Sequence, residues 1–187
     1  MALGEKLDFS QEGPLSLVVC GGAALNILGV FARTTRDVDV VALARDEGGE
    51  IAFEFADIPP RVRKLASEVG DDLGLGRSWL NTGPSELLRK GLPPGAEARL
   101  LKFEFGRWLR VYFLGREDLI CLKLYAAASR SGNAQRHFED LRRLAPDEVS
   151  LTRARDWSLT QDETEDFKSE LKRVLSNMEH EDLAYGW

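Results

Sequence analysis

Apolar residues in the first half of the chain come in short runs separated by glycines and polar turns. One run covers residues 15–19 and ends at Cys20-Gly21-Gly22, and another covers residues 37–43 after a polar turn at 33–36. Residues 23–31 between them are apolar nearly all round, which predicts a buried helix. The pattern therefore predicts a strand, a glycine turn, a helix and a second strand.

The pattern continues with short elements up to about residue 115. Residues 51–55 predict a short strand or a turn, and Pro59-Pro60 begins a predicted helix whose apolar face repeats at helical spacing. Residues 98–105 and 108–114 are predicted strands that flank Gly106-Arg107, which predicts a hairpin with a two-residue turn.

From Asp118 onward the pattern is helical. Predicted helices cover residues 119–128, 137–144, 147–157 and 162–178. We therefore expect an α+β fold: a mixed sheet with helices over residues 1–115, and a helical region over residues 116–187 packed on it. Residues 1–14 predict a short lead-in with one helical turn.

Composition narrows the functional classes. The 187 residues are 43% hydrophobic and 30% charged, with a formal net charge of -6, so general adhesion to nucleic acid or to an anionic membrane is not expected. Cys20 and Cys121 each lie in an apolar run and predict core thiols in a reducing compartment. No run is long enough to span a membrane and no signal peptide is visible, so we expect a cytoplasmic protein.

Two aspartates open the second predicted strand. Side chains of a strand alternate between its faces, so Asp37 and Asp39 are expected on one face while Val38 and Val40 point into the core. Two adjacent carboxylates repel each other unless a cation lies between them. Mg²⁺, or Mn²⁺, is the cation that oxygen ligands suit and that usually also holds a substrate phosphate. A solvated strand face with two unrelated acids is the alternative.

The glycine pair predicts the other half of a site. Gly21 and Gly22 lie where a strand meets a helix, and a backbone without Cβ atoms lets N–H groups approach an anion. A plain tight turn is the alternative. A phosphate-binding turn beside a metal-binding acid pair predicts a nucleoside triphosphate as ligand.

These residues carry a resemblance. Gly21-Gly22 followed by Asp37-Val38-Asp39 looks like the signature of the DNA polymerase β-type nucleotidyltransferase superfamily. The later segments resemble a bacterial family of nucleotidyltransferase-like proteins related to AbiEii-type toxins. Those segments are residues 118–127 and 137–141, together with Trp79-Leu80-Asn81 and Gly91-Leu92-Pro93.

The resemblance implies that Asp37 and Asp39 hold the metal while a nucleotidyl group passes from a triphosphate to an acceptor hydroxyl. It also implies a third carboxylate on a later strand. Glu104, in Phe103-Glu104-Phe105, has the local form of that acid, whereas the neighbouring strand offers only Tyr112. Glu104 is the predicted third catalytic residue, and a site with two acids is the alternative.

Further polar residues are candidates for phosphate or substrate contact. Arg36 lies beside the aspartates and either pairs with them or touches a phosphate. Lys123 is the one internal charge of an apolar helix; it either forms an ion pair, for instance with Asp140, or contacts the triphosphate or acceptor. Asp140 has the same two interpretations.

The leading hypothesis is thus a metal-dependent nucleotidyltransferase with an RNA, protein or small-molecule acceptor. A toxin-type enzyme that acts on tRNA or protein and is neutralised by an antitoxin-like partner is its biological variant. The alternative from another class is an inactive relative that keeps the fold and serves as a nucleotide-binding or interaction protein.

Overall fold

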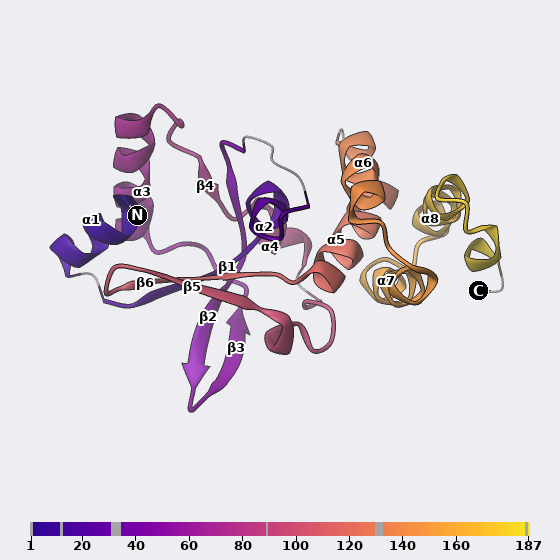
Figure 1. Cartoon of the computed structure of the whole chain (residues 1–187), viewed down its shortest axis with the longest axis horizontal. Helices are drawn as coiled ribbons and strands as arrows, with labels where there is room; N and C mark the ends of the chain where they lie inside the picture. The colour runs from indigo at the N-terminus through magenta and orange to yellow at the C-terminus, as the bar shows by residue number, and fades with distance from the viewer. Residues whose placement is uncertain (1, 12, 31–34, 89, 130–132, 186) are drawn as a thin grey trace. The chain divides into compact units, whose positions relative to one another are not determined.

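The computed structural model describes residues 2–11, 13–30, 35–88, 90–129, 133–185 and 187 (Figure 1). The chain divides into two compact units. The sheet unit comprises Met1–Gly91 and Gly95–Gly115, and the helical unit comprises Leu92–Pro94 and Arg116–Trp187. A mixed sheet with helices in one unit and helices in the other confirm the predicted α+β class.

The sheet unit is built on a mixed sheet, six-stranded within the described residues, in the order β3-β2-β1-β6-β5, with β4 paired to β2 off this path. β1 runs antiparallel to β2 and parallel to β6, and β2 runs parallel to β4. The strands are β1 (Leu15–Cys20), β2 (Val38–Glu47), β3 (Glu50–Glu54), β4 (Leu80–Asn81), β5 (Leu101–Phe105) and β6 (Leu109–Phe113).

Helices pack against this sheet because their apolar faces need cover. α2 and α4 contact β2, α2 also contacts β1, and α1 contacts α3 and β6 (Figure 1). The central strands supply a core of fully buried aliphatic side chains, among them Val18, Val19, Val40 and Val41. The helices are α1 (Ala2–Ser10), α2 (Gly21–Ile27), α3 (Pro60–Leu73) and α4 (Gly83–Leu87), with a 3₁₀ turn, η1, at Ala96–Arg99.

The helical unit packs around α5. This helix is apolar on nearly every face, and it contacts α6, α7 and α8. Tyr125 of α5 meets the rings of Trp157 and Phe167, with centroids 5.9 Å and 5.3 Å away. No helix in the described part of the chain is long and apolar enough to cross a membrane. The helices are α5 (Arg116–Ala128), α6 (Ala134–Leu144), α7 (Glu148–Gln161) and α8 (Glu165–Asn177), with a 3₁₀ turn, η2, at Glu181–Ala184.

Several predicted boundaries were wrong. The second strand continues past residue 43 to Glu47 because it pairs with β3 as an antiparallel hairpin. The lead-in is a full helix, α1, which docks on α3. The strand predicted over residues 98–105 begins only at Leu101, after η1. Residues 31–34, which belong to the end of the helix predicted over 23–31 and to the polar turn predicted at 33–36, lie outside the described residues.

The turn between β5 and β6 also differs from the prediction. Phe105 pairs with Leu109, so three residues, not two, connect the strands. The Asp8 carboxylate of α1 accepts hydrogen bonds from the N–H groups of Arg107 and Trp108, at 2.9 Å and 3.1 Å to Oδ1. Gly106, at φ +73°, leaves room for that carboxylate. A contact with a distant residue therefore sets this turn.

Candidate functional site

The pairing of β1 with β2 brings Asp39 to the end of β1. Val18 pairs with Ala42, but Val19 pairs with Val40, so the register shifts by one residue at this point. Without the shift, Cys20 would lie opposite Val40; with it, Cys20 lies opposite Asp39. Such bulges commonly re-aim a side chain beside a functional site.

Gly21 directly follows, and it lies against the Asp39 carboxylate. A Cβ atom built on Gly21 would collide with Oδ2 of Asp39. Gly21 also adopts φ +68°, a left-handed conformation that residues with a Cβ rarely take. Both the space and the backbone at this position therefore require glycine, and the Asp39 carboxylate occupies the room that results.

The second glycine and Asp37 are joined through Thr35. A Cβ on Gly22 would lie 3.0 Å from Oγ1 and 3.1 Å from Cβ of Thr35. The Thr35 hydroxyl donates a hydrogen bond to the Asp37 carbonyl oxygen at 3.0 Å. Thr35 thus holds the backbone of Asp37 beside the glycine turn, just before β2 begins. The Asp37 side chain is exposed, whereas Asp39 is half-buried.

Asn81 is the neighbour of Asp39 on its other side. β4 pairs with β2 so that Asn81 lies level with Asp39, and its Nδ2 donates to Asp39 Oδ1 at 3.1 Å. Its Oδ1 accepts from the Gly83 N–H at 3.2 Å, at the start of α4. Both ends of the amide are therefore used, and the Asn81 side chain is fixed with its N–H groups toward the carboxylate.

Trp79 anchors the strand that carries Asn81. Its indole N–H donates to the Ala66 carbonyl of α3 at 2.7 Å, and its own carbonyl accepts from the Val38 N–H at 2.6 Å. A Cβ on Gly70 would lie 2.8 Å from the indole ring, so the ring packs where that glycine leaves space. This anchor ties α3 to β2 directly beside the two aspartates.

The acid pair has the composition of a site for a hard cation. In the part of the chain that the structure describes, neither aspartate forms a salt bridge, and the exposed Arg36 forms none with them. Of the two Asp39 oxygens, one lies in the space that Gly21 leaves and the other accepts from a neutral amide. Carboxylate oxygens are the ligands that Mg²⁺ and Mn²⁺ take. The residues present therefore fit such an ion.

Glu104 lies away from this pair. It is on β5 and pairs with Arg110 of β6. Arg110 in turn pairs with Ser16 of β1, which is four residues before Cys20. β5 is three strands from β2, so strand and residue spacings put Glu104 roughly 20 Å from Asp39. Its carboxylate pairs instead with Lys102 at 2.8 Å and Arg110 at 3.5 Å. The structure therefore does not bring Glu104 together with the two aspartates.

The strand next to β1 supplies no acid at the level of the pair. Tyr112, the other candidate for the third position, is level with Val18 and is only 5% exposed. Leu114, just after β6, is the residue beside Cys20, and its N–H donates to the Val19 carbonyl at 3.0 Å. Across the described sheet, the row through Asp39 thus runs Leu114, Cys20, Asp39, Asn81. No group of three or more His, Cys, Asp or Glu that could hold a metal is found among the described residues.

Lys123 and Asp140 form an ion pair inside the helical unit. Their charged atoms are 2.7 Å apart, and their side chains are 8% and 2% exposed. His137 Nδ1 lies 3.5 Å from the Lys123 ammonium. A buried ammonium is stabilised by such a carboxylate, so the structure gives this lysine the ion-pair partner that the sequence suggested. A contact of either residue with substrate stays a prediction.

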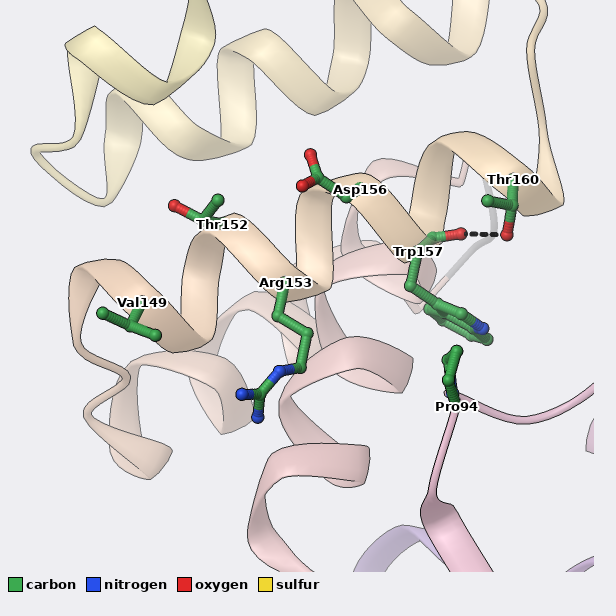
Figure 2. A pocket seen from close by; sticks show the side chains of 7 residues that line it. All are labelled: Pro94, Val149, Thr152, Arg153, Asp156, Trp157 and Thr160. Atoms are coloured by element: carbon green, nitrogen blue, oxygen red, sulfur yellow. Dashed lines mark hydrogen bonds between the residues drawn. The ribbon is translucent and has the colours of Figure 1, made fainter.

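A hollow lies along one face of α7 (Figure 2). Its volume is about 590 Å³, and Pro94 lies opposite the Trp157 ring. None of the residues predicted for the site lines it. The lining side chains of α7 follow helical spacing: Val149, Thr152, Arg153, Asp156, Trp157 and Thr160.

Sequence reasoning missed two residues of the site, Asn81 and Thr35. The sequence indicates Asn81 only as part of a family-like segment, although a polar residue directly after the apolar Trp79-Leu80 is a signal for a strand end. Thr35 belongs to the predicted polar turn at 33–36 and shows no functional signal there. The contact of Asn81 with Asp39 and that of Thr35 with Gly22 are non-local, and no spacing in the sequence displays them.

Comparison with known proteins points to one family. A family model described as "nucleotidyltransferase of unknown function (DUF6036)" matches residues 3–135. The match covers Gly21, Gly22, Asp37, Asp39 and Asn81, and it ends before Asp140. No curated protein and no solved structure matches the chain.

Gly21→Ala is expected to destabilise the fold by about 2–3 kcal/mol, because it adds left-handed backbone strain and a collision with Asp39. Gly29→Ala is the matched control: Gly29 has the same φ of +68°, but nothing lies within 4 Å of its Cβ position. That control should lose only about 1–2 kcal/mol. Urea unfolding measures both, and equal losses would contradict the close approach of Asp39 to Gly21.

Asp140→Ala is expected to cost about 3–5 kcal/mol, because it leaves the buried Lys123 ammonium without its carboxylate. The double variant Lys123→Met/Asp140→Leu replaces both charges by apolar groups and should recover most of this loss. Chemical denaturation of the parent protein, the single variant and the double variant measures the three free energies of unfolding. A single variant as stable as the parent, or a double variant worse than the single one, would contradict a structural ion pair.

Proposed function

The chain belongs to the DUF6036 family of nucleotidyltransferases, and on that premise we propose that Asp37, Asp39 and the glycine turn form its catalytic site. The observation that carries the proposal is the packing of the Asp39 carboxylate into the space at Gly21. The pairing of β1 with β2 thus places the proposed phosphate-binding turn next to the acid pair. The substrate implied by the family is a nucleotide, and we assign it as a nucleoside triphosphate.

Asp37 and Asp39 would hold Mg²⁺ or Mn²⁺. When bound, such an ion neutralises charge on the phosphates and aligns them with the attacking oxygen. Asn81 orients the Asp39 carboxylate through its amide N–H, and Thr35 holds the backbone of Asp37. The N–H groups of Gly21 and Gly22 would bind phosphate oxygens, because no Cβ screens them. Arg36, exposed and beside the pair, would add a positive charge to the phosphates.

In the proposed reaction, an acceptor hydroxyl oxygen attacks the α-phosphorus of the triphosphate. The bond from that phosphorus to the β-phosphate oxygen breaks, pyrophosphate leaves and the nucleotidyl group stays on the acceptor. The hydroxyl proton passes to a base, and we assign this role to the carboxylate of Asp37 or Asp39. Glu104 is a poor candidate, because Lys102 holds its carboxylate in an ion pair and lowers its pKa.

One observation favours a second candidate function. A third carboxylate does not lie beside the acid pair in the described sheet, where Tyr112 of β6 and Leu114, just after β6, are the neighbours of the end of β1. A two-acid site is also the arrangement of a protein that binds a nucleotide without transferring it. Calorimetry that detects triphosphate binding, together with no product on any acceptor, would favour this alternative.

The acceptor class is a further part of the proposal. The resemblance to a family related to AbiEii-type toxins favours a macromolecular acceptor, tRNA or protein, and a neutralising partner protein. Growth arrest when the parent chain is expressed, and normal growth when the Asp37→Ala variant is expressed instead, would support the toxin interpretation. Unimpaired growth at high expression would count against it.

Asp37→Ala and Asp39→Ala should each lower transfer by on the order of 10³-fold, because several kcal/mol of charge stabilisation are lost with the ion. The assay incubates each α-³²P-labelled triphosphate with Mg²⁺ and with tRNA, total protein or small hydroxyl compounds. Glu104→Gln is the matched acidic control and should retain activity. Transfer that survives both aspartate substitutions, or that vanishes in Glu104→Gln alone, would overturn the assignment.

Asn81→Ala should raise the Mg²⁺ concentration for half-maximal transfer by about 10- to 100-fold, as expected for a residue that orients a metal ligand. Thr82→Val is the control on the same segment, because Thr82 donates to Asp57 and does not touch Asp39. Mn²⁺ binding followed by water-proton relaxation gives a readout that is independent of turnover. An unchanged metal requirement in Asn81→Ala would remove Asn81 from the site.

A further inference from the structure

β5 is an edge strand with an unusual surface. It pairs with β6 on one side, and among the described strands none pairs with its other side. Residues 101–104 are exposed and Phe105 is half-buried. Such an edge presents unpaired backbone N–H and C=O groups to any strand that can approach it.

The two faces of β5 differ in character. Leu101 and Phe103 lie on one face and are 38% and 40% exposed, which is high for large apolar side chains in a strand. Lys102 and Glu104 lie on the other face and carry opposite charges. Glu104 is level with Arg110 of β6, so the charged face continues into the next strand.

We propose that β5 is the dimerisation strand of this protein and pairs antiparallel with β5 of a second copy. The two-fold axis passes through Phe103. Lys102 then lies opposite Glu104 of the partner subunit, and Phe103 lies opposite Phe103 of the partner subunit. Leu101 lies opposite Phe105 of the partner subunit. A two-fold axis is compatible with both kinds of residue pair in an antiparallel ladder, so the backbone allows this pairing.

The charge pattern selects this register over its neighbours. An axis through Lys102 would set the two copies of that lysine against each other, and an axis through Glu104 would do the same with two carboxylates. An axis between residues is excluded, because it would pair residues whose side chains lie on opposite faces of the sheet. Only the axis through Phe103 matches opposite charges on one face and apolar groups on the other.

The pairing also completes interactions that already exist within one chain. Glu104 would lie between Arg110 of its own chain and Lys102 of the partner subunit. Phe103 already packs edge-on against Phe113, with ring centroids 5.5 Å apart, and the partner strand would cover its exposed side. The two sheets would then join into one continuous sheet with an apolar stripe on one face.

Sedimentation equilibrium of the full chain tests the proposal through charge reversal. Lys102→Glu and Glu104→Lys each create two like-charge pairs and should weaken dimerisation by on the order of tenfold. The double variant Lys102→Glu/Glu104→Lys restores opposite charges and should restore the affinity. Lys168→Glu reverses another paired lysine, which is half-buried on α8, and should leave dimerisation unchanged. The proposal would be overturned if the parent chain were a monomer at every concentration. It would also be overturned if the two single variants and the double variant dimerised with the same affinity.

Cysteine cross-linking tests the register. The native residues Cys20 and Cys121 are buried. Disulfide formation between two copies therefore reports on a cysteine introduced at the surface of β5. Only a residue on the two-fold axis meets its own copy, so Phe103→Cys should form a disulfide-linked dimer on mild oxidation, and Leu101→Cys should not. The double variant Leu101→Cys/Phe105→Cys should cross-link. Cross-linking of Leu101→Cys alone, or failure of Phe103→Cys, would place the axis elsewhere or exclude the pairing.

Discussion

The approach of the Asp39 carboxylate to Gly21 is the constraint on which the rest of the site depends. It requires that β2 pair with β1 in the shifted register that sets Asp39 opposite Cys20. It also requires a residue without a Cβ, in a left-handed conformation, directly after the strand. If either condition failed, the carboxylate and the glycine turn would be two unrelated features of neighbouring strands. Together they place an acid where the glycine turn begins.

The surrounding sheet unit keeps that approach in place from the other side. Asn81 reaches Asp39 across 42 positions of sequence, and it arrives there because Trp79 binds the α3 backbone and pairs with Val38. The amide is neutral, so it orients the carboxylate without neutralising its charge. A basic side chain in the same place would form a permanent ion pair with the Asp39 carboxylate and compete with a metal ion.

The sequence allowed good prediction of the features that are local. The glycine pair, the two aspartates and the strands that carry them follow from composition and alternation within about 25 residues, and the α+β class follows from the change of period after Asp118. Non-local features could not be predicted. The β5–β6 turn depends on Asp8, 99 positions from Arg107, and the place of Asn81 depends on a two-residue strand too short to show a period.

Glu104 shows why the third acid in particular could not be assigned from its local pattern. An acid between two phenylalanines on a strand looks the same whether the strand is central or at an edge. Sheet order decides its environment: β5 lies at the edge, with Lys102 and Arg110 as the neighbours of the carboxylate. These cations lower the pKa of Glu104 and hold it ionised. Its charge is therefore better suited to matching a partner surface than to accepting a proton, and the two aspartates are left as the acids at the glycine turn.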